Sequence, residues 1–224
     1  PEGGYIIDIP AGASLNKVLT SLHSNGVLEV IWPAKLYAKE FELANTIKVG
    51  EFKLPTKANI QSLFELITGN NQVQYQVQFI DGSRLTEVLA VLDSQEKLTH
   101  ILRGKNHEEI LTALELGSSI KHLEGQFYPD TYAYQKGDSD ISILTRAHKH
   151  LQQVLNQEWL NKQKDLPLKS AYEALILASI VEKETGASAE RAQISGVFTR
   201  RLNAKMRLQT DPTVIYGLGD DYQG

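Results

Sequence analysis

The sequence predicts an α+β protein in which a small N-terminal region of strands and helices precedes a mostly helical C-terminal region. Three observations support this prediction. A strand, a glycine turn and an amphipathic helix occur twice near the N-terminus, a segment of period-two alternation lies between the two copies, and helical periodicity dominates from about residue 96 onward. We therefore expect two domains, residues 1–95 and 96–224, with the border near 95–100.

Composition narrows the class of protein. The chain has 224 residues, of which 42% are hydrophobic, and can bury a core. A net charge of −4 and the lack of a long Lys/Arg run argue against a nucleic-acid partner. There is no cysteine, which excludes disulfides and thiolate zinc sites. Residues 219–224 are typical of the middle of a turn, so we expect the natural chain to continue beyond both ends.

The repeated unit begins at Ile7 and again at Val77, and each copy reaches a glycine, Gly12 or Gly82. Apolar residues then recur at the i, i+3, i+4, i+7 spacing of an amphipathic helix, with Ser14 a candidate cap for the first helix. These residues are Leu15, Val18, Leu19 and Leu22 in the first copy and Leu85, Val88, Leu89 and Leu92 in the second.

Between the copies, residues Ile47–Leu54 alternate with period two and predict a strand that Pro55 ends. A helix is expected next, with Ile60, Leu63, Phe64 and Ile67 on its apolar face. Residues 73–79 alternate again and predict the strand of the second copy.

The C-terminal region is expected to be helical, with no strand. One stripe runs from Ile141 to Leu155, a helix from Ala171 to about Thr185, and another from about Ala189 to Asn203. The segment 124–134 is rich in aromatic residues and too irregular for a strand. The six histidines lack metal-ligand spacing, so we expect them to be solvated and predict no metal site.

Glu184 is the most informative residue of the expected helix over 171–185. At about 100° per residue it projects from the centre of an apolar stripe made of Ile176, Leu177, Ile180 and Val181, whereas Glu182 points nearly the opposite way. A carboxyl held against apolar surroundings has a pKa above its reference of about 4.3 and can act as a general acid. The alternative is a structural ion pair with a nearby arginine. The candidates are Arg191, Arg200, Arg201 and Arg207.

Four separated blocks of the chain resemble, in order and spacing, the YceG-like family of endolytic murein transglycosylases. They are Leu123–Tyr132, Leu177–Thr185, Glu190–Arg191 with Val197–Phe198, and Met206–Gly217. One departure lies after the Val-Phe block, where the family has Asn-Arg-Leu and this chain has Arg200-Arg201-Leu202. Arg200 is therefore left out of the expected site.

The resemblance implies a LysM-like region at 1–95 and a catalytic domain at 96–224 that continues past this C-terminus. It implies that Glu184 is the catalytic acid of a lytic transglycosylase, which cleaves the bond between N-acetylmuramic acid and N-acetylglucosamine and leaves a 1,6-anhydro end. No metal or organic cofactor is required. An ordinary hydrolase would instead use two carboxylates and water.

The resemblance also implies glycan-binding residues in two blocks. They are Glu124, Tyr128 and Asp130 in the first, and Gln209, Asp211, Thr213 and Tyr216 in the second. Simpler roles are open to all of them, because Glu124 and Asp130 can cap helices or turns, and an Asx-type turn explains the segment 209–213.

The family resemblance places the body of the protein outside the cytoplasmic membrane, in the periplasm or at the outer face, held by a single anchor that this sequence lacks. Its expected partners are peptidoglycan glycan strands and the peptidoglycan synthesis machinery. The competing hypothesis is a non-catalytic peptidoglycan-binding or scaffold protein of the cell envelope, in which Glu184 is structural.

Overall fold

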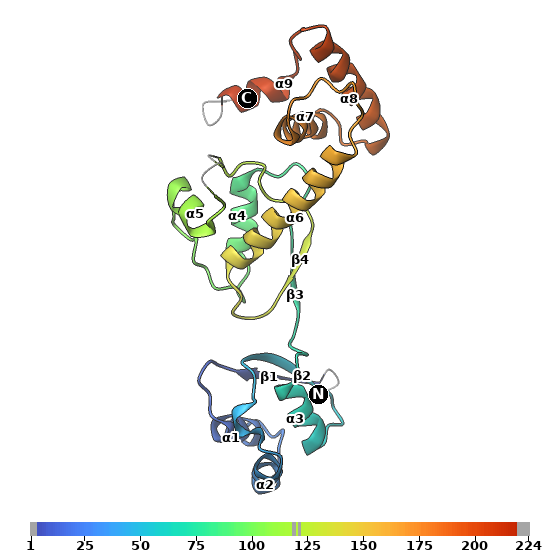
Figure 1. Ribbon diagram of the computed structural model, residues 1–224. Coiled ribbons are helices and arrows are strands. Elements are labelled where there is room, and N and C mark those ends of the chain that lie inside the picture. The colour runs from blue at the N-terminus through green and yellow to red at the C-terminus, as the bar shows by residue number, and fades with distance from the viewer. Residues whose placement is uncertain (1–3, 118–119, 121, 219–224) are drawn as a thin grey trace. The chain divides into compact units, whose positions relative to one another are not determined.

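The computed structural model describes residues 4–117, 120 and 122–218 and has an α+β architecture, which confirms the predicted fold class (Figure 1). The expected turn at 219–224 lies outside the described residues. The chain divides into two compact units. Unit 1 comprises residues 1–77, 95–99 and 133–139, and unit 2 comprises 78–94, 100–132 and 140–224.

Unit 1 contains a two-stranded antiparallel sheet and helices that cover it. The strands are β1 (Tyr5–Ile9) and β2 (Gly50–Leu54), paired with Ile7 opposite Phe52. The helices are α1 (Leu15–Ser24), α2 (Trp32–Glu40) and α3 (Ile60–Thr68), with a short 3-10 turn η1 (Leu43–Asn45). The sequence predicted β1, α1, β2 and α3, and missed α2.

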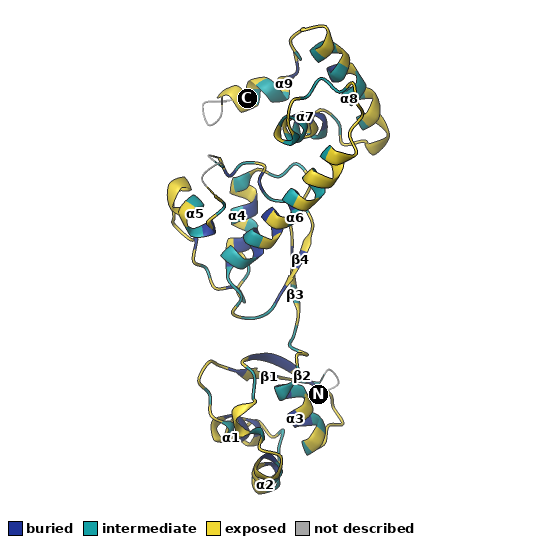
Figure 2. Ribbon diagram, viewed as in Figure 1, coloured by how far each residue is buried: buried dark blue, intermediate teal, exposed yellow. Residues whose placement is uncertain are grey.

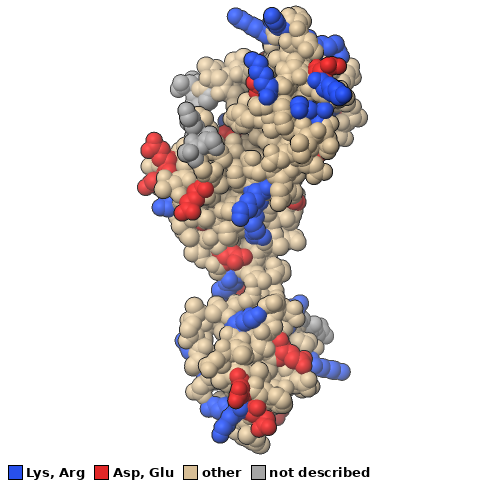
Figure 3. Space-filling model, viewed as in Figure 1, with Lys and Arg blue, Asp and Glu red and all other residues tan. Residues whose placement is uncertain are grey.

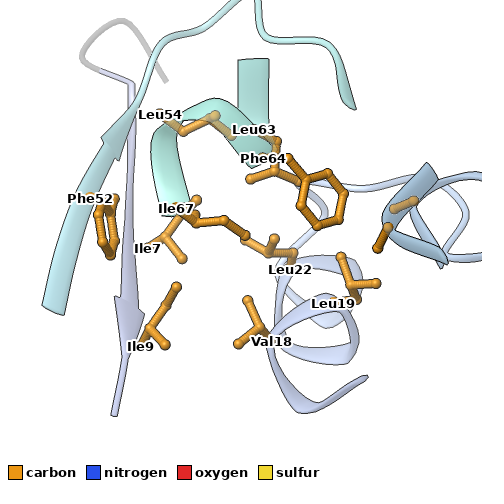
Figure 4. Packing of buried hydrophobic residues seen from close by; sticks show 12 residues of the cluster. Ile7, Ile9, Val18, Leu19, Leu22, Phe52, Leu54, Leu63, Phe64 and Ile67 are labelled. Carbon is orange, nitrogen blue, oxygen red and sulfur yellow. The ribbon is translucent and has the colours of Figure 1, made fainter. Parts of the chain in front are cut away.

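The core of unit 1 follows from the predicted periodicities. Figure 4 shows Ile7, Ile9 and Phe52 of the sheet facing side chains of α1 and α3. The Ser14 hydroxyl caps α1 by accepting a hydrogen bond from the Lys17 amide at 3.3 Å, as expected. The period-two and period-3.6 patterns therefore meet in one apolar layer.

Unit 2 is helical except near its border with the rest of the chain. Its helices are α4 (Leu85–Asp93), α5 (His107–Leu114), α6 (Asp140–Leu160), α7 (Ala171–Glu184), α8 (Ser188–Asn203) and α9 (Asp211–Leu218). The helices expected over 141–155, 171–185 and 189–203 are confirmed. Figure 2 shows that α8 exposes much of its surface, whereas α6 buries residues along its first turns.

The expectation of no strand after residue 96 is wrong. Residues Thr131–Tyr134 form β4, which pairs with β3 (Tyr75–Gln78) in a second two-stranded sheet. Tyr132 and Tyr134 are buried and alternate with exposed neighbours. Four residues of alternation are too short to be recognised beside the irregular Pro-containing segment that precedes them.

The second copy of the repeat is divided differently from the first. Gly12 and Gly82 both have positive φ, +74° and +72°, so both glycines make the turn that the repeat predicted. The second turn and its helix α4, however, belong to unit 2, where the Phe79 amide donates to the Asp130 carbonyl at 2.9 Å. In this part of the chain the border between the two compact units lies after residue 77. The functional domains 1–95 and 96–224 stay a prediction.

Among the described residues, no helix has both the length and the apolar character needed to cross a bilayer.

On the face that Figure 3 presents, acidic and basic side chains are interspersed with large uncharged areas.

Candidate active site

Helix α7 positions the candidate acid. Ser170 caps the helix, its hydroxyl accepting from the Glu173 amide at 3.2 Å. The helix ends at Glu184, because Thr185 adopts an extended conformation and Gly186 follows. The Thr185 hydroxyl then donates to Glu190 at 2.8 Å and accepts from the Ala187 amide at 3.0 Å, which fixes the turn into α8.

One face of α7 packs on α8 through a small apolar cluster. Leu177, Ile180 and Val181 are buried with Phe198 of α8, and Ile194, Leu202 and Leu208 pack around them. Three of the four residues of the predicted stripe are therefore buried, whereas Ile176 is 45% exposed and lines a pocket on another side of α7. The stripe ends one turn before Glu184.

The expectation that Glu184 lies in apolar surroundings is wrong, because its side chain is exposed. It does leave α7 on the same side as the buried stripe, but it occupies the last helical residue, where no element among the described residues covers it.

The expected alternative, an ion pair between Glu184 and an arginine, is also absent from the described part of the chain. Arg191 binds Glu182 instead, with 2.7 Å between Nη2 and Oε2. Glu182 lies on another side of α7, beside the turn at Gly82. A Cβ atom placed on Gly82 would lie 3.4 Å from Cγ of Glu182. The two glutamates thus differ: Glu182 is held in a salt bridge and Glu184 is not.

Among the described residues, Thr210 is the one side chain that holds Glu184. Its hydroxyl donates a hydrogen bond to Oε2 of Glu184, and the residue is buried, with 7% of its surface exposed. Gln209 and Asp211 were predicted site residues, but Thr210 between them was not. The only signal for Thr210 in the sequence is its hydroxyl group within the block Met206–Gly217, and no periodicity connects this residue to Glu184.

Three predicted site residues of the block Met206–Gly217 lie next to Thr210 in the sequence. Gln209 is exposed with a positive φ of +50°, and Asp211 is the exposed first residue of α9. The Thr213 hydroxyl donates to the Thr210 carbonyl at 2.7 Å. The turn expected over 209–213 is therefore largely the first turn of α9, because only Gln209 and Thr210 precede the helix. Pro212 lies in this first turn, where proline is tolerated.

Glu124 and Tyr216 come together in a pocket of about 510 Å³ on another side of α7. Glu124 accepts a hydrogen bond from the Leu85 amide at the start of α4, at 3.0 Å. Partial burial raises the pKa of the Tyr216 phenol, and the charge of Glu124 and a hydrogen bond to it act in the same direction. Arg84 and Tyr172 also line this pocket.

Tyr128 and Asp130 form a separate group around His150 of α6. The rings of Tyr128 and His150 have centroids 4.3 Å apart, and Asp130 lies 3.5 Å from Nδ1 of His150. The Tyr132 hydroxyl donates to the Tyr128 carbonyl at 2.6 Å and supports this segment from the buried side. No contact in the described chain joins this group to Glu184.

Helix α9 connects two of the three groups. Thr210, which holds Glu184, directly precedes Asp211, the first residue of α9, and Tyr216, five residues after Asp211, meets Glu124. Those five residues rise about 7.5 Å along a helix axis. The expected residues thus divide into the Glu184 group, the Glu124 group and the Tyr128 group. No cluster of His, Asp or Glu suited to a metal ion occurs within residues 4–117, 120 and 122–218.

Fold and site together define an α+β protein whose helical unit presents an uncovered carboxyl near a polar, tyrosine-lined pocket. The chain belongs to the YceG-like family, whose model matches residues 7–224. It is 26% identical to an endolytic murein transglycosylase of Bacillus subtilis over an alignment of 228 residues that covers 95% of this chain and 63% of that protein.

A second similar protein is an endolytic murein transglycosylase of Streptococcus pneumoniae. It is 25% identical over an alignment of 240 residues that covers 95% of this chain and 43% of that protein. The chain therefore spans about two fifths to three fifths of the length of these relatives. A crystal structure of a yceG-like protein from Listeria monocytogenes matches 98% of this chain and 77% of its own, with 27% identity and a TM-score of 0.46.

Proposed function

We propose that the protein containing this chain is a lytic transglycosylase of peptidoglycan and that Glu184 is its general acid and base. Cleavage is proposed at the β-1,4 bond from N-acetylmuramic acid to N-acetylglucosamine. The observation that carries the proposal is the state of Glu184, an exposed carboxyl at a helix end whose Oε2 is held by Thr210 and which has no salt bridge in the described chain.

The proposed reaction needs one carboxyl because the substrate supplies the nucleophile. Glu184 donates a proton to the glycosidic oxygen as its bond to C1 of the muramoyl residue breaks. The acetamido group of the same sugar stabilises the positive charge at C1. The C6 hydroxyl oxygen then bonds to C1 and returns its proton to Glu184, so the product is a 1,6-anhydro sugar and no water is consumed.

A bound strand would also provide the desolvation that the free protein lacks. Removal of water from around a carboxyl favours its neutral, proton-donating form. A glycan strand lying over Glu184 would cover it, while Thr210 keeps one oxygen in place and the other oxygen faces the strand. The acid would therefore be prepared by the substrate and not by the fold alone.

The other expected residues are proposed to bind glycan. Gln209, Asp211 and Thr213 lie next to Thr210, the partner of Glu184, and Tyr216 of α9 contacts Glu124. Tyr128 and Asp130 stand apart with His150, so their proposed role is at a more distant sugar. Neither a metal nor an organic cofactor takes part in the proposed steps.

Supporting evidence comes from the YceG-like family and from two relatives named endolytic murein transglycosylases. A protein with this activity works where peptidoglycan is, so we propose an extracytoplasmic body, a membrane anchor outside this sequence, and contact with the peptidoglycan synthesis machinery.

A second candidate function is glycan binding without catalysis. A pocket of about 800 Å³ in unit 1 favours it, lined by the β1–α1 turn at Pro10–Ser14 and by the segment from Ala44 to Val49. In this case the N-terminal unit would hold peptidoglycan and Glu184 would have no chemical role.

The products distinguish these functions. Purified peptidoglycan is incubated with the full-length protein and the fragments are analysed by mass spectrometry. The proposed function predicts anhydro ends, whereas a hydrolase would leave reducing ends heavier by the mass of one water molecule. An absence of released fragments would favour binding alone.

A further inference from the structure

Two adjoining pockets form a continuous trench in unit 2, of which the proposed function uses only Glu124 and Tyr216. The pocket of about 510 Å³ that holds Glu124 and Tyr216 shares His122, Tyr172 and Leu175 with a second pocket of about 770 Å³. We call the two together the α6–α7 trench. The larger pocket is lined by residues of both α6 and α7, whereas the smaller one is lined by α7, by α9 and by residues outside these helices such as Arg84 and Glu124.

The sequence spacing explains why these helices form walls. On α6, His148, Gln152 and Asn156 recur every four residues and therefore project from one side. On α7, Tyr172, Ile176 and Ser179 recur at i, i+4 and i+7. This side of α7 is nearly opposite to the stripe that packs on α8, so the trench and Glu184 lie on different sides of the helix.

Two mostly buried polar residues line the larger pocket. Gln126 is 5% exposed and His148 is 9% exposed. Nδ1 of His148 lies 3.0 Å from the backbone carbonyl of Gln126, and this contact orients the imidazole beside the pocket.

The two ends of the trench differ in charge. The larger pocket is lined by amide, imidazole and hydroxyl groups together with apolar side chains, and has no Asp, Glu, Lys or Arg. The smaller pocket carries one cation and one anion, Arg84 and Glu124, which form no salt bridge with each other in the described chain. An occupant should therefore present amides and small apolar groups along its length, and both a carboxylate and an ammonium near one end.

We propose that the α6–α7 trench binds the peptide stem of the peptidoglycan strand. A short peptide of alternating L and D residues has backbone amides for Gln126, Gln152 and Asn156, methyl groups for the apolar wall, a carboxylate for Arg84 and an amine for Glu124. This inference rests on the proposed function, because it identifies a second part of the same substrate.

The test measures peptide binding directly. The full-length protein is titrated with the tetrapeptide L-alanyl-γ-D-glutamyl-L-lysyl-D-alanine by isothermal titration calorimetry. Saturable binding is expected, and Gln152→Met, which keeps the side-chain length and removes the amide, should raise Kd about fivefold or more. Gln153→Met is the matched control, because Gln153 is the exposed neighbour that does not line the trench. Gln126→Met should weaken binding as well.

The inference is overturned if the wild-type protein releases anhydro ends but does not bind the tetrapeptide. Equal Kd values for Gln152→Met and Gln153→Met would overturn it too, as would displacement of the peptide by an N-acetylglucosamine tetramer. Peptide binding by a protein that releases no anhydro ends would support the trench and contradict the proposed function alone.

Discussion

The buried hydroxyl of Thr210 donates a hydrogen bond to the exposed carboxylate of Glu184 across 26 residues of sequence. The contact links the end of α7 to the start of α9. Because Thr210 is fixed by burial and by its carbonyl bond with Thr213, it restricts the positions that the Glu184 carboxyl can take. We infer that Thr210 is a positioning residue for the proposed acid.

Replacing Thr210 with Val should therefore lower kcat about tenfold, with a smaller effect on KM. The loss of one hydrogen bond to a charged group, about 1.5 kcal/mol, corresponds to this factor. Release of anhydro ends under saturating and limiting peptidoglycan separates the two constants. Thr210→Ser keeps the hydroxyl and should restore most of kcat, and failure of Ser to do so would show that packing alone matters at this position.

The stability of unit 1 should depend on pH through Glu51. This buried carboxylate of β2 accepts hydrogen bonds from Tyr75 and from Lys97, whose Nζ is 2.8 Å away, and Lys136 lies at 3.4 Å. Burial alone would raise the pKa of Glu51, but the bonds from Lys97 and Tyr75 outweigh it and hold the pKa below its ordinary value of 4.5. The carboxylate thus stabilises the folded state above that pH, and this contribution is lost as the pH falls through the lowered pKa.

Glu51→Gln should destabilise the protein by about 1–3 kcal/mol at pH 7 and make unfolding less dependent on pH below 4.5. Urea unfolding followed by circular dichroism at several pH values measures both effects. Glu96→Gln, at an exposed site, serves as the control. A Glu51 variant that loses stability in acid as steeply as the wild type would refute this role.

The contact between α7 and α8 should be sensitive to truncation of Phe198. The ring is 4% exposed and packs with Leu177, Ile180 and Val181 in a cluster of only a few buried residues. Phe198→Ala should cost about 3 kcal/mol of unfolding free energy, because it removes apolar contacts and leaves a cavity. Val197→Ala, at a position 36% exposed, should cost clearly less in the same urea titration, and similar losses for the two would contradict the packing described.

Periodicity predicted much of the fold because it reports which side of an element is buried. The stripes of α1, α3, α4 and α7 were correctly identified, and the glycine turns at 12 and 82 were as well. The same reasoning failed for Glu184. A helical projection shows which way a side chain points, but not whether a neighbouring element extends far enough to cover it. Glu184 points to the buried side yet extends beyond it.

Contacts between distant segments were outside the reach of sequence patterns. Thr210 meets Glu184, and Glu51 meets Lys97 and Lys136, only because the fold brings these segments together. His148 was expected to be solvated, but it lies on the buried side of α6 and is 9% exposed. His148 follows Leu144 by four residues and precedes Leu151 by three, so the helical spacing that defined the stripe of α6 could have identified it.

The most direct measurement compares Glu184→Gln with Glu182→Gln in the full-length protein, with release of anhydro-ended fragments from purified peptidoglycan as the readout. The two residues lie on one helix, and Glu182 is engaged by Arg191. We predict that Glu184→Gln lowers the rate by about a hundredfold or more, whereas Glu182→Gln stays within about fivefold of the wild type. Undiminished release by the Glu184 variant would contradict the assignment of this carboxyl as the acid.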